Sequence, residues 1–220
     1  METTKEEVLR IILDTKVIAV IRMADANKVA KVVAAIQAGG VKAIEITMTT
    51  PGALDEIRIM SSQKIPGVII GAGTVLDSET AASVIRAGAD FVVSPILNEE
   101  MIRLCRQYGK LVVPGALTPT EIIKAWDAGA DIVKIFPATS VGPRYFKDLK
   151  GPLPQVRLMP TGGVDLENAA EFIRNGACCV GIGTALLDKK AIQAGDWMVL
   201  TKKAAELITS VQNVWMKPIP

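Results

Sequence analysis

The amino-acid sequence predicts a single α/β domain, residues 1–220, folded as a (β/α)8 barrel with an additional helix at its N-terminus. Eight short apolar runs alternate with segments that carry helix start signals, the pattern of repeated βα units. Glycine marks recur at intervals of about 40 to 50 residues and divide the chain into four similar two-strand units. A length of 220 residues with 50% hydrophobic side chains suits one domain with a full core.

The apolar runs are continuous rather than alternating, which is typical of parallel strands buried on both faces. A doubly wound open sheet is the alternative. Its G-x-G-x-x-G fingerprint is absent after the first run, which continues into Arg22-Met23-Ala24-Asp25. The predicted strands are residues 17–22, 43–47, 67–74, 91–95, 111–116, 131–136, 156–162 and 178–183.

Helix boundaries are marked by residues with known capping preferences. Asp77, Asn98, Thr118 and Asp165 stand where helices should begin, since their side chains can accept hydrogen bonds from the first free N–H groups. Helices are also predicted over residues 5–14, covering the barrel bottom, and after residue 196, before a loose end at 218–220. The glycine marks, expected to adopt the left-handed conformation that ends a helix, lie in the tripeptides 38–40, 87–89, 128–130 and 175–177.

Composition excludes several classes of function. A net charge of +2 with interspersed signs gives no basic surface for nucleic acid or membrane, and no apolar run is long enough for a membrane span. The acidic, amphipathic N-terminus does not resemble a secretory signal. Three cysteines without any histidine argue against the usual zinc-binding spacings and indicate reduced core thiols of a cytoplasmic protein. Acid–base catalysis must therefore use a carboxylate, lysine, tyrosine or water.

Lys134 is the most informative residue, because it lies inside the apolar run 131–137. Burial disfavours its charged form, and a neutral amine is the nucleophile that forms a Schiff base with a carbonyl. The alternative is a lysine that extends its charge to solvent. Glu45 lies in the second apolar run and Arg22 ends the first, so the barrel topology would bring three charges to one mouth. Glu45 could serve Lys134 as a proton carrier or form a structural ion pair.

Glycine-rich turns at the same end of the barrel indicate an anion site. Residues 160–164 (PTGGV) follow the seventh strand and residues 181–184 (GIGT) end the eighth, where barrels often bind phosphate. The same glycines would also suit tight turns without a ligand. Thr74, in GAGTV, could contact a carboxylate or carbonyl oxygen, or only end a capped turn.

Together these segments resemble the 2-keto-3-deoxy-6-phosphogluconate (KDPG) / 4-hydroxy-2-oxoglutarate (KHG) aldolase family, the class I pyruvate aldolases of the Entner–Doudoroff pathway. The resemblance covers nearly the whole chain, through AGGVKAIEIT, GAGTVL, VVSP, VVPGALTPTE, VKIFPA, MPTGGV and GIGTAL in order. It implies a homotrimeric barrel without metal or other cofactor that acts on a keto-acid phosphate. It also implies cleavage of KDPG to pyruvate and glyceraldehyde 3-phosphate, and of 4-hydroxy-2-oxoglutarate to pyruvate and glyoxylate.

The resemblance also implies roles for individual residues. Lys134 would form the imine and Glu45 would carry protons. The substrate would contact Arg22, Thr47, Thr74, Pro95, Phe136 and Thr161, and the phosphate would lie on Gly162, Gly163, Gly183 and Thr184.

One position departs from the family pattern. Many members write the second-strand motif as E-x-T-x-R-T, with an arginine that binds the pyruvyl carboxylate, but this chain has Thr49 there. Relatives acting on the 6-phosphogalactonate epimer lack it too and use an arginine at the end of strand one, where this chain has Arg22. We therefore expect Arg22 to neutralise the carboxylate. The alternatives are a 2-dehydro-3-deoxy-6-phosphogalactonate aldolase, a phosphate-binding epimerase without Schiff-base chemistry, and a non-catalytic binding barrel.

Overall fold

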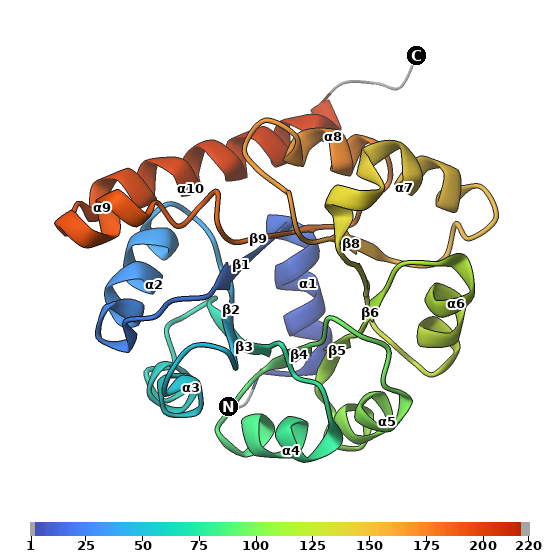
Figure 1. Cartoon of the computed structure of the whole chain (residues 1–220), viewed down its shortest axis with the longest axis horizontal. Helices are drawn as coiled ribbons and strands as arrows, with labels where there is room; N and C mark the ends of the chain where they lie inside the picture. The colour runs from blue at the N-terminus through green and yellow to red at the C-terminus, as the bar shows by residue number, and fades with distance from the viewer. Residues whose placement is uncertain (1–2, 217–220) are drawn as a thin grey trace.

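The structure, a computed structural model, describes residues 3–216. Its strands are all parallel and short, and they correspond to the predicted apolar runs. Helices surround them, so that the chain proceeds around the molecule as successive βα units (Figure 1). The strands are β1 (Val17–Ile21), β2 (Ala43–Thr47), β3 (Ile69–Gly73), β4 (Phe91–Val93), β5 (Leu111–Val113), β6 (Gly115–Ala116), β7 (Val133–Ile135), β8 (Leu158–Pro160) and β9 (Val180–Ile182).

The strands form two parallel sheets that curl around a common centre. The larger has the order β5-β4-β3-β2-β1-β9, and the smaller has the order β6-β7-β8. Near one junction, the Gly115 amide donates to the Ile96 carbonyl at 3.1 Å. At the other, a parallel bridge joins Thr161 to Gly181. The predicted α/β class with a curled parallel sheet is confirmed.

The predicted fifth strand is interrupted at Pro114, which separates β5 from β6. Proline has no N–H to donate, so it cannot continue a ladder in both directions. Its carbonyl still accepts from the Lys134 amide at 2.8 Å. The interruption therefore lies directly beside the strand that carries Lys134.

The helices begin largely where the capping signals predicted. Asp77, Asn98 and Thr118 accept hydrogen bonds at the starts of their helices, and Thr118 forms a reciprocal capping box with Glu121. Asp165 instead closes a turn by accepting from the Asn168 amide at 2.9 Å, and the helix begins later. The α-helices are α1 (Lys5–Thr15), α2 (Val29–Ala38), α3 (Ala53–Ser62), α4 (Ser78–Arg86), α5 (Glu99–Gln107), α6 (Pro119–Asp127), α7 (Gly142–Lys150), α8 (Ala169–Arg174), α9 (Lys189–Ala194) and α10 (Trp197–Gln212).

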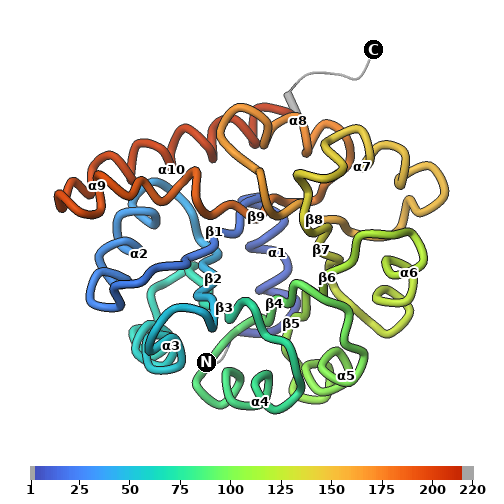
Figure 2. The backbone as a smooth tube through the Cα atoms, in the orientation of Figure 1, coloured from blue at the N-terminus to red at the C-terminus, as the bar shows by residue number. Residues whose placement is uncertain are grey.

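Short 3-10 helices complete the secondary structure: η1 (Ala26–Lys28), η2 (Ala138–Ser140) and η3 (Asn213–Met216). The final helix predicted after residue 196 is α10, which packs against α2 and α8 and runs along one side of the molecule (Figure 2). The prediction of a loose end at 218–220 lies outside the described residues. Gly88, Gly129 and Gly176 all have φ near the left-handed region, at 102°, 101° and 103°, as predicted for glycines that end helices.

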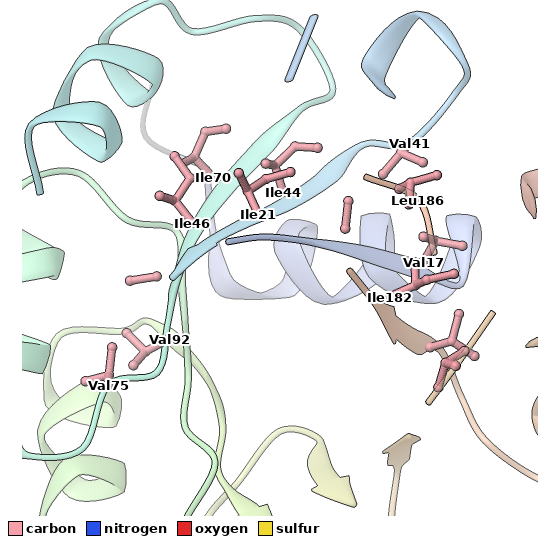
Figure 3. Packing of buried hydrophobic residues seen from close by; sticks show 14 of the residues in the cluster. Val17, Ile21, Val41, Ile44, Ile46, Ile70, Val75, Val92, Ile182 and Leu186 are labelled. Atoms are coloured by element: carbon pink, nitrogen blue, oxygen red, sulfur yellow. The ribbon is translucent and has the colours of Figure 1, made fainter. Parts of the chain in front are cut away.

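Hydrophobic side chains form two clusters, one on each face of the curled sheets. The larger lies between strands and helices, where Ile21, Ile44 and Ile70 from neighbouring strands pack together (Figure 3). The smaller is enclosed by the strands and is closed at one end by Val8 and Ile12 of α1. Alternate residues of each strand supply the two faces. Polar side chains on the inner face must therefore lie beyond the smaller cluster, toward the carboxyl ends of the strands.

Candidate functional site

Lys134 lies in β7 on the inner face and is only 4% exposed. Burial is the main cause that lowers the pKa of its amine, and the positive charge of Arg22 lowers it further, whereas Glu45 acts in the opposite direction. The Nζ atom lies 4.9 Å from the centre of the Phe136 ring. Lys134 therefore does not extend to solvent, and its surroundings favour the neutral, nucleophilic amine.

Glu45 lies in β2 and is 1% exposed. Burial raises the pKa of its carboxyl group, while Lys134 and Arg22 partly oppose this rise. Neither carboxylate oxygen has a hydrogen-bond partner within the described chain. The structural ion pair considered from the sequence is thus not formed by Glu45, because such a pair would give these oxygens a partner. A buried carboxyl group without partners is costly, and such groups occur mainly at functional sites.

Arg22 follows β1 directly and is exposed at the rim. Its Nη2 donates to the hydroxyl of Thr74 at 3.5 Å. Thr74 follows β3 and adopts a left-handed φ of 57°, a conformation that L-residues rarely take. This conformation places a threonine hydroxyl beside the guanidinium, although the two residues follow different strands. The rim therefore offers a cation and a hydroxyl together, a combination suited to a carboxylate.

Thr161 follows β8 and is 8% exposed, and its hydroxyl has no hydrogen-bond partner among the described residues. A Cβ atom at Gly181 would collide with the Thr161 hydroxyl, so the missing side chain makes room for it. Within residues 3–216, Thr161 and Glu45 account for three of the four buried polar side-chain atoms that lack a partner, the fourth being the hydroxyl of Ser61. Glu45 lies in β2 and Thr161 directly after β8, whereas Ser61 lies on α3, outside the strands.

The predicted phosphate loop follows Thr161. Gly162 and Gly163 have φ values of 87° and 74°, and a Cβ at Gly163 would collide with Thr139 of η2. Asn168 fixes the loop by donating to the Gly163 carbonyl at 2.9 Å. Glycine is required here both for conformation and for the close packing of the turn.

The remaining predicted residues differ in their surroundings. Thr47 is fully buried, and its hydroxyl lies 3.0 Å from that of Thr49 and 3.3 Å from that of Thr50. Pro95 is half-buried beside Gly115, and Phe136 is 36% exposed. Gly183 is half-buried and Thr184 is exposed after β9.

Thr50 contacts this set but was missed in the sequence. Its hydroxyl donates to the Ile21 carbonyl at 3.4 Å and accepts from the Met23 amide at 3.3 Å, so it holds the backbone on both sides of Arg22. The only sequence signal is the run of hydroxyl residues after Glu45, which does not reveal a contact with another strand.

Two further properties of the structure bear on chemistry. Within residues 3–216, no group of three His, Cys, Asp or Glu side chains is placed to hold a metal ion. No helix in the described part of the chain is long and apolar enough to span a membrane.

Comparison with known proteins shows the family of the chain. The family model of KDPG and KHG aldolases matches residues 8–203. A 2-dehydro-3-deoxy-phosphogluconate aldolase from Pseudomonas aeruginosa is 40% identical over 176 residues, 79% of each chain. A native KDPGal structure is similar with a TM-score of 0.84 and 30% identity, over 91% of this chain and 96% of that one. A KDPG aldolase from Legionella pneumophila, with pyruvate captured as a covalent carbinolamine, has a TM-score of 0.83 and 28% identity, over 90% of this chain and 97% of that one. The chain belongs to the KDPG and KHG aldolase family.

Proposed function

We propose that this chain is a class I aldolase, a lyase that reversibly cleaves 2-dehydro-3-deoxy-6-phosphogluconate to pyruvate and glyceraldehyde 3-phosphate. Cleavage of 4-hydroxy-2-oxoglutarate to pyruvate and glyoxylate is a second activity of the same site. The observation that carries the proposal is the buried amine of Lys134, whose pKa is lowered by burial and which interacts with the charge of the Glu45 carboxyl group on β2. The covalent carbinolamine in the Legionella relative supports the same chemistry.

The proposed reaction begins when the neutral Lys134 amine attacks the C2 ketone of the substrate. Loss of water from the carbinolamine gives an imine that draws electrons from the adjacent carbons. Glu45, directly or through water, accepts the proton of the C4 hydroxyl, and the C3–C4 bond breaks to leave an enamine. The carboxyl group then returns a proton to C3, and hydrolysis of the imine frees pyruvate. The raised pKa of Glu45 suits this proton exchange, because general acid–base catalysis is most effective near the operating pH.

Substrate binding is assigned by position around Lys134. Arg22, with Thr74, would hold the carboxylate, and the unpartnered hydroxyl of Thr161 would contact the C4 hydroxyl. Thr47, Pro95 and Phe136 complete the proposed substrate contacts, and the phosphate would lie on Gly162, Gly163, Gly183 and Thr184.

We further propose that residues 1–220 form one closed (β/α)8 barrel, capped at the bottom by α1, and that the cytoplasmic enzyme is a homotrimer. The Gly115–Ile96 hydrogen bond and the Thr161–Gly181 bridge support closure, since they connect the two sheets at both junctions. The site needs no metal or organic cofactor, because Lys134 supplies the covalent chemistry.

The 6-phosphogalactonate epimer is a second candidate substrate. The observation that favours it is the pairing of Arg22 with Thr74 at the rim, together with Thr49 in the place of the usual arginine. Measurement of kcat/KM for both epimers and for 4-hydroxy-2-oxoglutarate decides between these substrates. A phosphate-binding epimerase or a non-catalytic barrel would not use a buried amine.

Borohydride reduction in the presence of pyruvate tests the proposal. We expect a stable adduct on Lys134, found by mass spectrometry of peptides, and its complete loss in Lys134→Ala. Lys150 is a suitable control, because burial also lowers the pKa of its amine, yet it donates to the carbonyls of Pro154 and Val156. Lys150→Ala should still form the adduct at Lys134. Absence of any adduct in the unsubstituted chain would refute the proposed chemistry.

A further inference from the structure

The Glu45 carboxylate occupies space that exists because residue 73 has no side chain. A Cβ atom built on Gly73 would collide with Oε1 of Glu45 and lie 2.6 Å from its Cγ. Gly73 ends β3 and pairs with Thr47, two residues beyond Glu45 on the neighbouring strand. The space therefore lies directly beside the carboxylate, on the inner face of the sheet.

The backbone gives no other reason for glycine at this position. Gly73 does not adopt a positive φ, unlike Gly162 and Gly163 in the phosphate loop. Alanine could thus adopt the same backbone conformation without strain. The methyl group of alanine would, however, displace the Glu45 carboxylate.

Hydrogen bonds do not fix the carboxylate either, since both oxygens lack a partner in the described chain. Its position is then determined by the side-chain torsions of Glu45 and by the atoms that surround it. Protein interiors are closely packed and contain few voids, so the space left by an absent side chain helps to determine where a neighbouring side chain can lie. A methyl group at position 73 would collide with the carboxylate and displace it.

We propose that Gly73 is a positioning residue that sets the place of the Glu45 carboxylate relative to the Lys134 amine, by steric contact rather than through the backbone. This inference rests on the proposed function, in which Glu45 exchanges protons with C3 of the bound pyruvyl unit. A displaced Glu45 carboxylate should slow that proton transfer. The contacts of Arg22 and Thr74 with the carboxylate of the substrate should remain in place.

A double-mutant cycle of Gly73→Ala and Glu45→Ala tests the contact, since alanine at position 45 has neither the Cγ nor the carboxylate that the added methyl group would meet. The readout is exchange of the pyruvate methyl protons for deuterium, followed by NMR. We expect Gly73→Ala to lower kcat for exchange roughly 100-fold with little change in KM, because positioned acid–base groups contribute factors of this size. In the Glu45→Ala background, the same Gly73→Ala change should lower the residual exchange rate less than about threefold, since residues in contact show non-additive effects.

Ala72→Gly is the matched control, because Ala72 belongs to the same strand but packs in the larger hydrophobic cluster, between the strands and the helices. It should lower the melting temperature and leave the exchange rate per folded molecule unchanged. The inference would be overturned if Gly73→Ala lowered the exchange rate by the same factor in both backgrounds, or lowered it in neither. So would failure of the double variant to fold, since that would show a role in the backbone. If the unsubstituted chain neither exchanges pyruvate protons nor forms the borohydride adduct, the proposed function itself fails.

Discussion

Replacing the buried pair Glu45 and Lys134 with apolar residues of similar size should abolish catalysis and stabilise the fold. Both side chains are almost completely buried, yet neither oxygen of Glu45 accepts a hydrogen bond within the described residues. Substituting well-packed apolar residues for buried charged pairs is often stabilising, by about 1–4 kcal/mol. We expect a gain of that size for Glu45→Leu combined with Lys134→Met. In a domain of this length each kcal/mol raises Tm by about 2–4 °C.

The gain should depend on pH in a way fixed by the two pKa shifts. Burial raises the pKa of Glu45 above 4.5. The destabilising effect of its buried, ionised carboxylate is therefore absent below pH 4.5 and develops as pH rises through the folded-state pKa. Burial lowers the pKa of Lys134 below 10.5, so its effect is present below the folded-state pKa and disappears as pH rises to 10.5. The stability difference between the double variant and the unsubstituted chain should therefore be greatest between these limits.

Urea unfolding followed by circular dichroism from pH 4 to 10 measures this difference. Each single substitution should stabilise less than half as much as the pair, because it leaves the other charge without its attraction. Glu206→Leu with Lys202→Met, exposed on α10, controls for the residue change and should alter stability by less than about 0.5 kcal/mol. A double variant that is less stable than the unsubstituted chain near neutral pH, or a gain that does not vary with pH, would refute this account.

Three further predictions follow from single sites. Arg22→Ala should raise KM for pyruvate in the condensation direction far more than Thr49→Ala, and steady-state kinetics with equal, small effects would contradict the carboxylate assignment. Thr118→Ala removes the capping box of α6 and should lower the free energy of unfolding by about 1 kcal/mol in urea titrations, whereas Thr118→Ser should retain it. Burial raises the pKa of the Cys105 thiol to about 12, so a thiol reagent at pH 8 should modify Cys105 only after unfolding; rapid modification of the native chain, detected by mass spectrometry, would contradict this.

The sequence predicted the positions of the strands well because each strand is marked by its own composition. The apolar runs and the glycines that end helices depend only on neighbouring residues, and the structure follows them closely. The exception at Pro114 is also local, since proline removes a donor in the middle of a predicted strand. Asp165 shows the limit of such signals, because a turn and a helix start use the same side-chain acceptor.

The site was only partly predictable, since its geometry depends on contacts between strands far apart in the chain. The inner-face location of Glu45 and Lys134 follows from strand periodicity, and their convergence follows from the predicted barrel. Three features are seen only in the three-dimensional structure: Glu45 has no hydrogen-bond partner among the described residues, there is space beside Gly73, and Thr50 contacts the backbone around Arg22. No pattern in a single sequence encodes which inner-face atoms meet.

The arrangement of Arg22 and Lys134 explains how one site can keep an amine neutral and still favour a protonated imine. In the free protein burial lowers the pKa of Lys134 and the positive charge of Arg22 lowers it further, which helps the amine to act as a nucleophile. Under the proposed function, the carboxylate of a bound keto acid pairs with Arg22 and offsets that charge. The attraction of Glu45 then remains as the main charge interaction at Lys134, and it favours a cation. Binding of the substrate would thus change the electrostatic preference of the site from free amine to iminium at the step where the iminium must withdraw electrons from the C3–C4 bond.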